Sequence, residues 1–159
     1  MTSHIRPMTK ADKIAIMNIL SATPEFKPSE VLVAAELIDY YLDDPIASGY
    51  HIYVMESEAR ITGYICYGPT PLTNGAWDIY WIAITPSRQR QGAGTALITY
   101  AEDQMNKAAG RISLIETSSK PEYEKTRRFY IKHGYEIISR IPDFYEPGDD
   151  KVTFWKRFR

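Results

Sequence analysis

Several features that often reveal a protein's class are scarce or missing in this sequence. Only one cysteine, Cys66, occurs among 159 residues, which excludes an internal disulfide and is compatible with a reducing compartment. No apolar run approaches the ~18 residues that a transmembrane helix needs, and the first residues lack the apolar core of a secretory signal. These absences predict a cytoplasmic protein without a membrane partner.

An excess of charge of either sign is also lacking. The chain has 19 lysines and arginines against 20 acidic residues, for a net charge of −1. Binding to nucleic acid normally requires a basic excess or stripe, so no such partner is expected. The three histidines do not have the spacing of metal ligands, and no metal site is predicted. The sequence leaves a homodimer open.

Repeats, low-complexity tracts and long linkers are absent too, which predicts one domain over residues 1–159. Hydrophobic periodicity predicts an α/β protein, with a mixed sheet and helices on both faces. An Asp-, Pro- and Gly-rich loop is expected over 142–149, and Asp12 and Ser29 are expected to cap the first two helices. The expected strands are 5–7, 51–56, 60–67, 77–85, 111–117, 135–141 and 152–155, and the later helices are 92–109 and 121–133.

The most informative stretch joins the expected strand 77–85 to the helix 92–109. Pro86 ends the strand, and a turn that contains Gly92 and Gly94 leads directly into the helix. The first N–H groups of a helix have no internal acceptor, and the helix dipole adds partial positive charge there. Because glycine lets an anion approach the backbone closely, this turn predicts a phosphate or pyrophosphate site.

Two common phosphate motifs do not fit this turn. A P-loop ends in Gly-Lys-Ser/Thr, and no lysine stands between Gly94 and Thr95. A dinucleotide fingerprint needs a third glycine, which residues 92–97 do not contain. For an isolated Gly-x-Gly, a helix start that uses glycine only for close packing is the alternative.

The longer segment, however, resembles the signature of the GNAT acetyltransferase superfamily. Gln89-Arg90-Gln91-Gly92-Ala93-Gly94 matches the pattern Q/R-x-x-G-x-G/A, after a strand and a proline-containing turn. Further along, the segment from Phe129 through Tyr130 to Gly134 and Tyr135 is similar to a later motif of the family, an aromatic–Tyr pair followed by x-x-x-Gly-aromatic. The resemblance covers about residues 5–158 by element order and 76–137 by motif. It implies a GNAT-like sheet whose fourth and fifth strands splay apart for the cofactor.

Acetyl-CoA is the cofactor that the resemblance implies. In the family, backbone amides of the signature turn bind the pyrophosphate, and the pantetheine arm pairs with the fourth strand. The side chains of Arg88 and Arg90 are near enough in sequence to reach a phosphate, with plain surface arginines as the alternative. The implied cofactor contacts are Ile82, Ala83, Ile84, Gln89, Arg90, Gln91, Gly92, Ala93, Gly94 and Thr95.

The resemblance also implies catalytic roles. The backbone N–H of Ile82 would polarise the acetyl carbonyl, and Tyr130 would protonate the departing thiolate, although a Phe-Tyr pair can also be plain core. An alkyl ammonium of pKa ~10 is almost fully protonated at pH 7, so a general base is expected. Asp78 is the first candidate, because it stands where many family members carry an acidic base, and spacing by two would place it on the same strand face as Ile82. Glu116 is the second, and a strand-end aspartate bound by turn amides is the structural alternative for Asp78.

Two positions depart from the family pattern. Tyr123 and Thr126 stand where many members have Asn and Ala, so those cofactor contacts cannot be carried over. The segment 143–150 has carboxylates and aromatic rings that could hold a cationic amine, or it is a solvated acidic turn.

The predicted function is an acetyl-CoA-dependent N-acetyltransferase that acetylates a primary amine of a small molecule by direct attack in a ternary complex. Two alternatives remain open. One is a non-catalytic acyl-CoA-binding sensor or docking domain, and the other is acetylation of a protein N-terminus or lysine.

Overall fold

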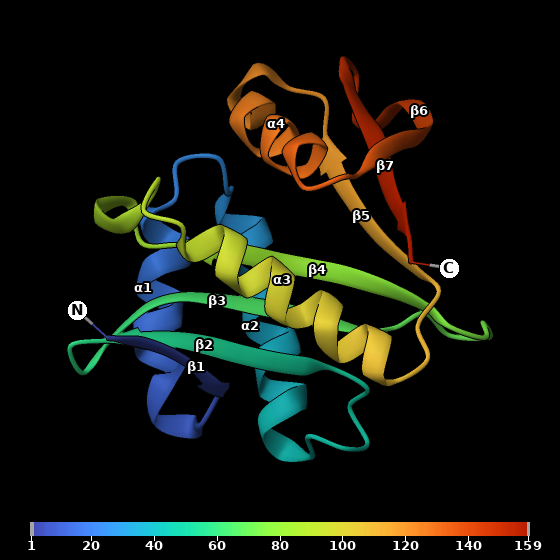
Figure 1. Ribbon diagram of the computed structural model, residues 1–159. Helices are drawn as coiled ribbons and strands as arrows, with labels where there is room; N and C mark the ends of the chain where they lie inside the picture. The colour runs from blue at the N-terminus through green and yellow to red at the C-terminus, as the bar shows by residue number, and fades with distance from the viewer. Residues whose placement is uncertain (1, 159) are drawn as a thin grey trace.

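A computed structural model describes residues 2–158, which form a mixed sheet of seven strands flanked by helices (Figure 1). The strand order is β1-β2-β3-β4-β5-β7-β6, and within these residues only the β4–β5 pair is parallel. The predicted α/β class is therefore confirmed. The strands are β1 (Ser3–Pro7), β2 (His51–Ser57), β3 (Arg60–Pro69), β4 (Ala76–Ile84), β5 (Ile112–Ser118), β6 (Glu136–Glu146) and β7 (Asp149–Arg157).

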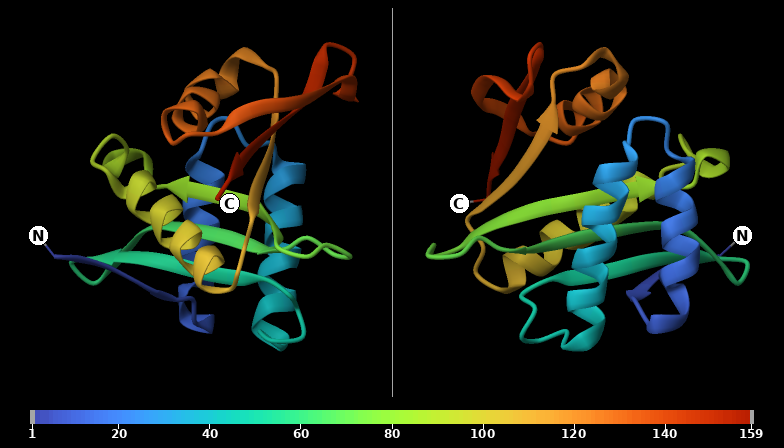
Figure 2. Two further views of the ribbon diagram at one scale, coloured as in Figure 1. Left: turned by 45° about the vertical axis from the view of Figure 1, so that its right-hand side comes forward. Right: turned by 180° about the vertical axis from the view of Figure 1, so that it is seen from behind.

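Helices cover both faces of the sheet (Figure 2). On one face α1 (Lys13–Ala22) and α2 (Pro28–Asp43) lie side by side, and on the other α3 (Ala93–Lys107) crosses β3 and β4. The last helix, α4 (Glu124–Lys132), lies beside β5, away from α1 and α2. Short 3-10 turns precede three of these helices: η1 (Lys10–Asp12), η2 (Pro86–Arg88) and η3 (Pro121–Tyr123).

Each face of the sheet has its own apolar core. Leu97 and Ile98 of α3 are fully buried in one core, together with Phe154 of β7. Ile16 of α1 and Ile38 of α2 belong to the other. Burying a side chain of this size contributes roughly 1.5–3 kcal/mol, so the two cores hold α3 and the α1–α2 pair firmly against the sheet.

The two parallel strands pair only at their beginnings. The ladder joins Ala76–Ile79 to Ile112–Ile115, and beyond it the strands separate. The rear view in Figure 2 shows β4 and β5 diverging from this base. The predicted splaying is therefore confirmed, and the edge of β4 beyond Ile79 has no pairing with β5.

A β-bulge interrupts β4 immediately after this point. Cys66 and Tyr67 are consecutive on β3, but they pair with Trp81 and Ile79, so Tyr80 is an extra residue on β4. A bulge of this kind shifts the alternation of side chains by one position.

This shift overturns one prediction about the site. Ile79 and Ile82 both pack on the α3 side of the sheet, although three positions separate them. Asp78, on the other side of the bulge, therefore faces away from Ile82. The prediction that Asp78 and Ile82 share a strand face is wrong, because strict alternation was assumed across Tyr80.

Of the two predicted helix caps, one holds in position only and the other is wrong. Asp12 is the N-cap residue of α1, but its carboxylate does not cap the helix; it accepts hydrogen bonds from the backbone N–H of Thr9 and from Arg6, both at 2.8 Å. Helix α2 begins at Pro28, so Ser29 lies inside the first turn. Proline suits the first helical position because the N–H that it lacks would be unpaired there anyway.

The loop expected over residues 142–149 is mostly strand. β6 continues to Glu146, and a short turn with Gly148 at φ 85° leads into β7 at Asp149. Pro142 is tolerated because β6 is the edge strand and its register shifts between Ile141 and Glu146.

Candidate active site

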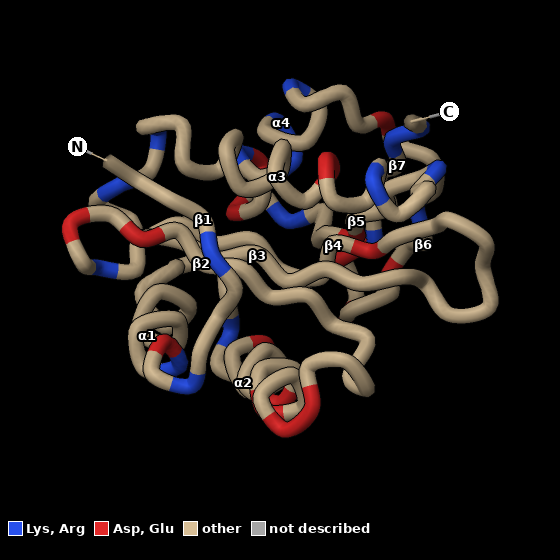
Figure 3. Tube along the Cα trace, turned by 60° about the horizontal axis from the view of Figure 1, so that its bottom comes forward, with Lys and Arg blue, Asp and Glu red and all other residues tan. Residues whose placement is uncertain are grey.

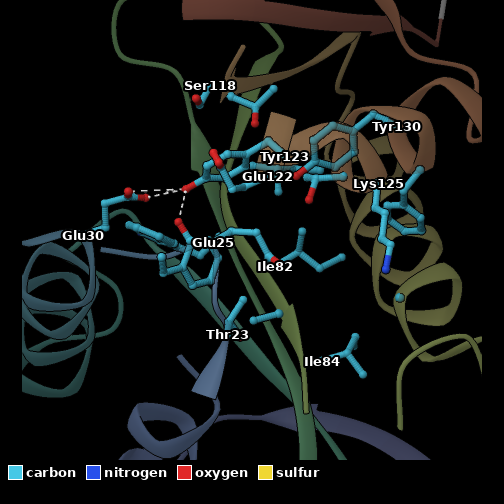
Figure 4. Close-up of a pocket in the computed structure, with 18 of the residues that line it drawn as sticks. Thr23, Glu25, Glu30, Ile82, Ile84, Ser118, Glu122, Tyr123, Lys125 and Tyr130 are labelled. Carbon is cyan, nitrogen blue, oxygen red and sulfur yellow. Dashed lines mark hydrogen bonds between the residues drawn. The ribbon is translucent and has the colours of Figure 1, made fainter. Parts of the chain in front are cut away.

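A cavity of about 1600 Å³ opens where β4 and β5 separate. Its walls come from the end of β4, the turn into α3, η3 with α4, and the segment between α1 and α2 (Figure 4). Pockets for drug-sized ligands are typically ~300–1,000 Å³. This cavity can therefore hold a long ligand together with a second small molecule.

The turn between β4 and α3 is built to bind an anion. Arg90 and Gly92 have left-handed backbones, with φ of 67° and 84°. Left-handed residues in a turn can bring successive N–H groups to one concave side. Gly92 is the N-cap of α3, and no side chain caps this helix. The first N–H groups of α3 are therefore available to a phosphate.

The two glycines of this turn are needed for different reasons. At Gly92 a Cβ would meet no described atom within 4 Å, so only its left-handed backbone favours glycine. At Gly94 a Cβ would lie 3.2 Å from the ring of Phe129, so glycine here allows α3 to pack against α4. Gly94 thus allows the turn to pack closely against α4, the helix that holds Tyr130.

Basic side chains surround the same end of the cavity. Arg90 of the turn lines it, together with Lys125, Arg128 and Lys132 of α4. Figure 3 shows Lys and Arg positions along α4 and Asp and Glu positions along α2. Arg88 also lines the cavity, with its guanidinium 3.3 Å from Glu58. Positive charge and free N–H groups together favour a phosphorylated ligand at this end.

Tyr130 lies on α4, beside the cavity that opens where the two strands separate. Its side chain is buried, with 5% exposure, and it borders the cavity. Its ring packs edge-on against Phe154, at 5.6 Å between centroids. Burial raises the pKa of the Tyr130 hydroxyl well above its ordinary value, so the group stays protonated at neutral pH. It can therefore act as a proton donor, most readily to a thiolate that forms directly against it.

The two candidate bases border the cavity from different strands. Asp78 of β4 accepts a 2.7 Å hydrogen bond from the hydroxyl of Thr70, so its partner is a side chain and not a turn amide. Glu116 of β5 is exposed, and Lys151 lies 3.8 Å from its carboxylate. The catalytic roles of Asp78 and Glu116 stay predictions.

The cavity brings most of the predicted cofactor contacts together. Gln91 and Ala93 are the exceptions, since they line a smaller pocket of about 210 Å³ beside β1 and β2. Their side chains therefore lie on the other side of the turn. The predicted residues that line the large cavity are Ile82, Ala83, Ile84, Gln89, Arg90, Gly92, Gly94, Thr95, Asp78 and Tyr130.

One contact at the cavity could not be foreseen from the sequence. The hydroxyl of Tyr123 lies 3.0 Å from both the backbone carbonyl of Glu25 and the carboxylate of Glu30, and its one proton can be donated to either acceptor. The only signal in the sequence was that tyrosine departs from the family pattern at this position.

Two negative findings concern residues 2–158. They contain no group of three or more His, Cys, Asp or Glu residues that could hold a metal ion. None of their helices is long and apolar enough to cross a membrane.

A sheet split between parallel strands, with an uncapped helix start beside the split, defines an α/β protein with a geometry suited to a phosphorylated ligand. A profile described as the acetyltransferase (GNAT) domain matches residues 48–137, more than half of the chain. The chain belongs to the GNAT acetyltransferase family.

Three known proteins illustrate this relationship. An uncharacterized N-acetyltransferase of Methanocaldococcus jannaschii is 30% identical over 105 residues, which are 66% of this chain and 65% of that protein, slightly less than two thirds of its length. A crystal structure of an acetyltransferase assigned to the GNAT family, from Desulfovibrio desulfuricans, has a TM-score of 0.94 at 36% identity, over 98% of this chain and 99% of that one. The PaiA N-acetyltransferase of Thermoplasma acidophilum, in complex with coenzyme A, has a TM-score of 0.78 at 13% identity, over 99% and 100%. At that identity the last comparison shows the fold alone.

Proposed function

We propose that this protein transfers the acetyl group of acetyl-CoA to a primary amine of a small molecule, by direct attack in a ternary complex. The observation that carries the proposal is one cavity bordered by the anion-binding turn, the free edge of β4 and Tyr130. Crystals of the Thermoplasma acidophilum neighbour contain coenzyme A, which supports the choice of cofactor.

The residues present fit acetyl-CoA. The free N–H groups that begin at Gly92 would hold its pyrophosphate, with Arg90 and the α4 cations beside it. The edge of β4 after Ile79 would pair with the extended pantetheine arm, as an added strand does. When bound, acetyl-CoA would supply an activated acetyl group.

Protein groups would then serve each step of the transfer. A base, Asp78 or Glu116 acting through water, would take a proton from the ammonium of the acceptor, and the freed amine would form the new N–C bond. The N–H of Ile82 would donate to the carbonyl oxygen as negative charge develops there. As the C–S bond breaks, Tyr130 would give its proton to the sulfur, and it would regain one from the nitrogen of the new amide, which must lose a second proton.

The acceptor would be a cationic small molecule bound at the end of the cavity away from the turn into α3. Glu116 of β5 lines the cavity, and so do Tyr145 and Asp149 of the β6–β7 region. Carboxylates and aromatic faces together favour an ammonium group.

Turnover tests the proposal. Acetyl-CoA would be mixed with a panel of small primary amines and, separately, with peptides that have free N-termini, and thiol release would be followed. We expect release with at least one small amine. Acetyl-CoA binding without release would support the sensor alternative, and release with peptides alone would overturn the small-molecule part.

A further inference from the structure

A hydrogen-bonded bridge crosses the open end of the split. Tyr123, in η3, reaches across the split, where its hydroxyl meets the carbonyl of Glu25 in the segment between α1 and α2 and the carboxylate of Glu30 at the start of α2. In Figure 4 Tyr123 lies between these two glutamates and Tyr130. The three bridging residues all line the cavity. The bridge thus joins parts of the chain that are 93 residues apart in sequence.

The bridge is a directional contact, not a chance approach of two surface groups. Burial and the nearby carboxylate of Glu30 raise the pKa of Tyr123 well above its ordinary value, so its hydroxyl stays a donor. Glu30 lies in the first turn of α2, and Phe26 packs edge-on against Trp81 at 5.3 Å, which fixes the α1–α2 segment on β4. A hydrogen bond to a carboxylate is roughly twice as strong as one between neutral groups.

The bridge also connects the two halves of the split on one side of the sheet. Ile82 is on β4, in the half of the molecule with α1 and α2, whereas Tyr130 is on α4, in the half with β5. These halves meet at the short ladder Ala76–Ile79 with Ile112–Ile115 and, on the α3 side of the sheet, where α3 packs against α4. On the α1–α2 side, the bridge joins them. Tyr123 is the N-cap residue of α4, so the bridge fixes the start of the helix that holds Tyr130.

A second link runs parallel to the first. Glu146, at the end of β6, pairs with Lys120 beside η3 and lies 3.6 Å from Lys27 in the α1–α2 segment. Lys27 and Glu146 are about half exposed, and exposed ion pairs typically contribute 0–1 kcal/mol. The bridge of Tyr123 is therefore the stronger of these two connections.

We propose that Tyr123 is a positioning residue: by bridging to Glu25 and Glu30 it sets the distance between the β4 edge and Tyr130, and so aligns the proton donor with the acetyl group. This inference rests on the proposed function. Misplacement of reacting groups by about 1 Å can cost on the order of 10²-fold in rate. Cofactor phosphates, bound at the turn into α3, are held independently of this bridge.

Tyr123→Phe tests the inference, because it keeps the ring and removes only the hydroxyl. We expect kcat for acetyl transfer to fall about tenfold or more, while the affinity for acetyl-CoA measured by calorimetry stays within about twofold. Tyr40→Phe is the matched control: Tyr40 lies on α2, is 65% exposed and does not line the cavity. An unchanged kcat in folded Tyr123→Phe would overturn the inference.

Variants of the partner distinguish positioning from general stability. Glu30→Gln keeps an acceptor oxygen and should retain most of kcat, whereas Glu30→Ala leaves only the carbonyl of Glu25 as acceptor and should give a kcat between those of the parent and Tyr123→Phe. The double variant Tyr123→Phe/Glu30→Ala should be no slower than Tyr123→Phe, because the hydroxyl that serves both acceptors is already gone. Multiplied defects in the double variant would contradict a shared role.

Hydrogen exchange gives a readout that does not depend on turnover. The amides of residues 25–27, 29 and 30 should exchange faster in Tyr123→Phe than in Tyr40→Phe, since the bridge holds that segment. If Tyr123→Phe exchanges faster but the parent protein acetylates no amine, the proposed function is contradicted, whereas the structural role of the bridge is supported. Equal exchange in both variants, with normal turnover, would contradict the bridge alone.

Discussion

The two ends of the cavity are made in different ways. At the proposed phosphate end the available groups are backbone N–H groups of an uncapped helix, presented by left-handed residues at Arg90 and Gly92. At the proposed acceptor end the lining groups are side chains, such as Tyr123, Glu30 and Tyr145, from segments far apart in sequence. A backbone site restricts which residues can stand at a few adjacent positions, so it leaves a local pattern. A site made of side chains can be assembled from many residues and leaves none.

The largest expected effect on kcat is that of substituting Tyr130, the proposed proton donor. Tyr130→Phe should lower kcat by ~10²-fold or more, because the proton donor is lost while the buried ring is kept. Affinity for acetyl-CoA should not change, which calorimetry on the same sample would check. Turnover equal to that of the parent would make Tyr130 a packing residue.

A substitution at Gly92 should weaken the proposed phosphate site at the turn into α3. Gly92→Asp should weaken acetyl-CoA binding at least tenfold, about 1.4 kcal/mol, since a carboxylate would lie where the pyrophosphate binds. Gly148→Asp is a matched control: Gly148 has φ 85°, against 84° at Gly92, and equally open surroundings. Calorimetry with acetyl-CoA measures both variants. Equal losses would mean that the Gly92 effect is backbone strain and not a lost phosphate site.

A smaller effect, dependent on pH, is expected at Asp78 on the acceptor side. Asp78→Asn should slow turnover several-fold near pH 7, where an amine of pKa ~10 is mostly protonated. The defect should shrink at pH 9–10, where more of the amine is free without a base. Turnover rates of the variant and the parent, measured from pH 7 to pH 10 at saturating acetyl-CoA, test this expectation. Parallel pH profiles for variant and parent would make Asp78 structural and direct the test to Glu116→Gln.

The smallest expected effect is on stability, and it concerns buried side chains with a raised pKa. Burial raises the pKa of Tyr64, Tyr130 and the Cys66 thiol above their ordinary values. At alkaline pH the unfolded chain loses these protons while the folded state keeps them, so the free energy of unfolding falls as pH rises. Thermal melts should show a steady midpoint below about pH 8 and a decline of a few degrees by pH 10. A rising midpoint would contradict this sign.

The contrast between backbone groups and side chains also explains how much of the structure could be predicted from the sequence. The glycine pattern and the proline before it predicted the turn into α3, because both report backbone conformation directly. The edge strand β6 was cut short in the prediction, since Pro142 argues against a strand except at an edge, and the sheet order was not yet known. Tyr123 and Glu30 could not be paired, since nothing local records a contact across 93 positions.

The bulge at Tyr80 limits how this protein can vary over evolutionary time. Removing or adding one residue in β4 would turn every later side chain to the opposite face, exchanging Ile82 with Ala83 against the α3 core. Substitutions keep the count and hence the orientation of the strand edge. Among relatives with the same chemistry, β4 should therefore change freely in residue type but keep a constant number of residues between its pairing with β5 and the turn into α3.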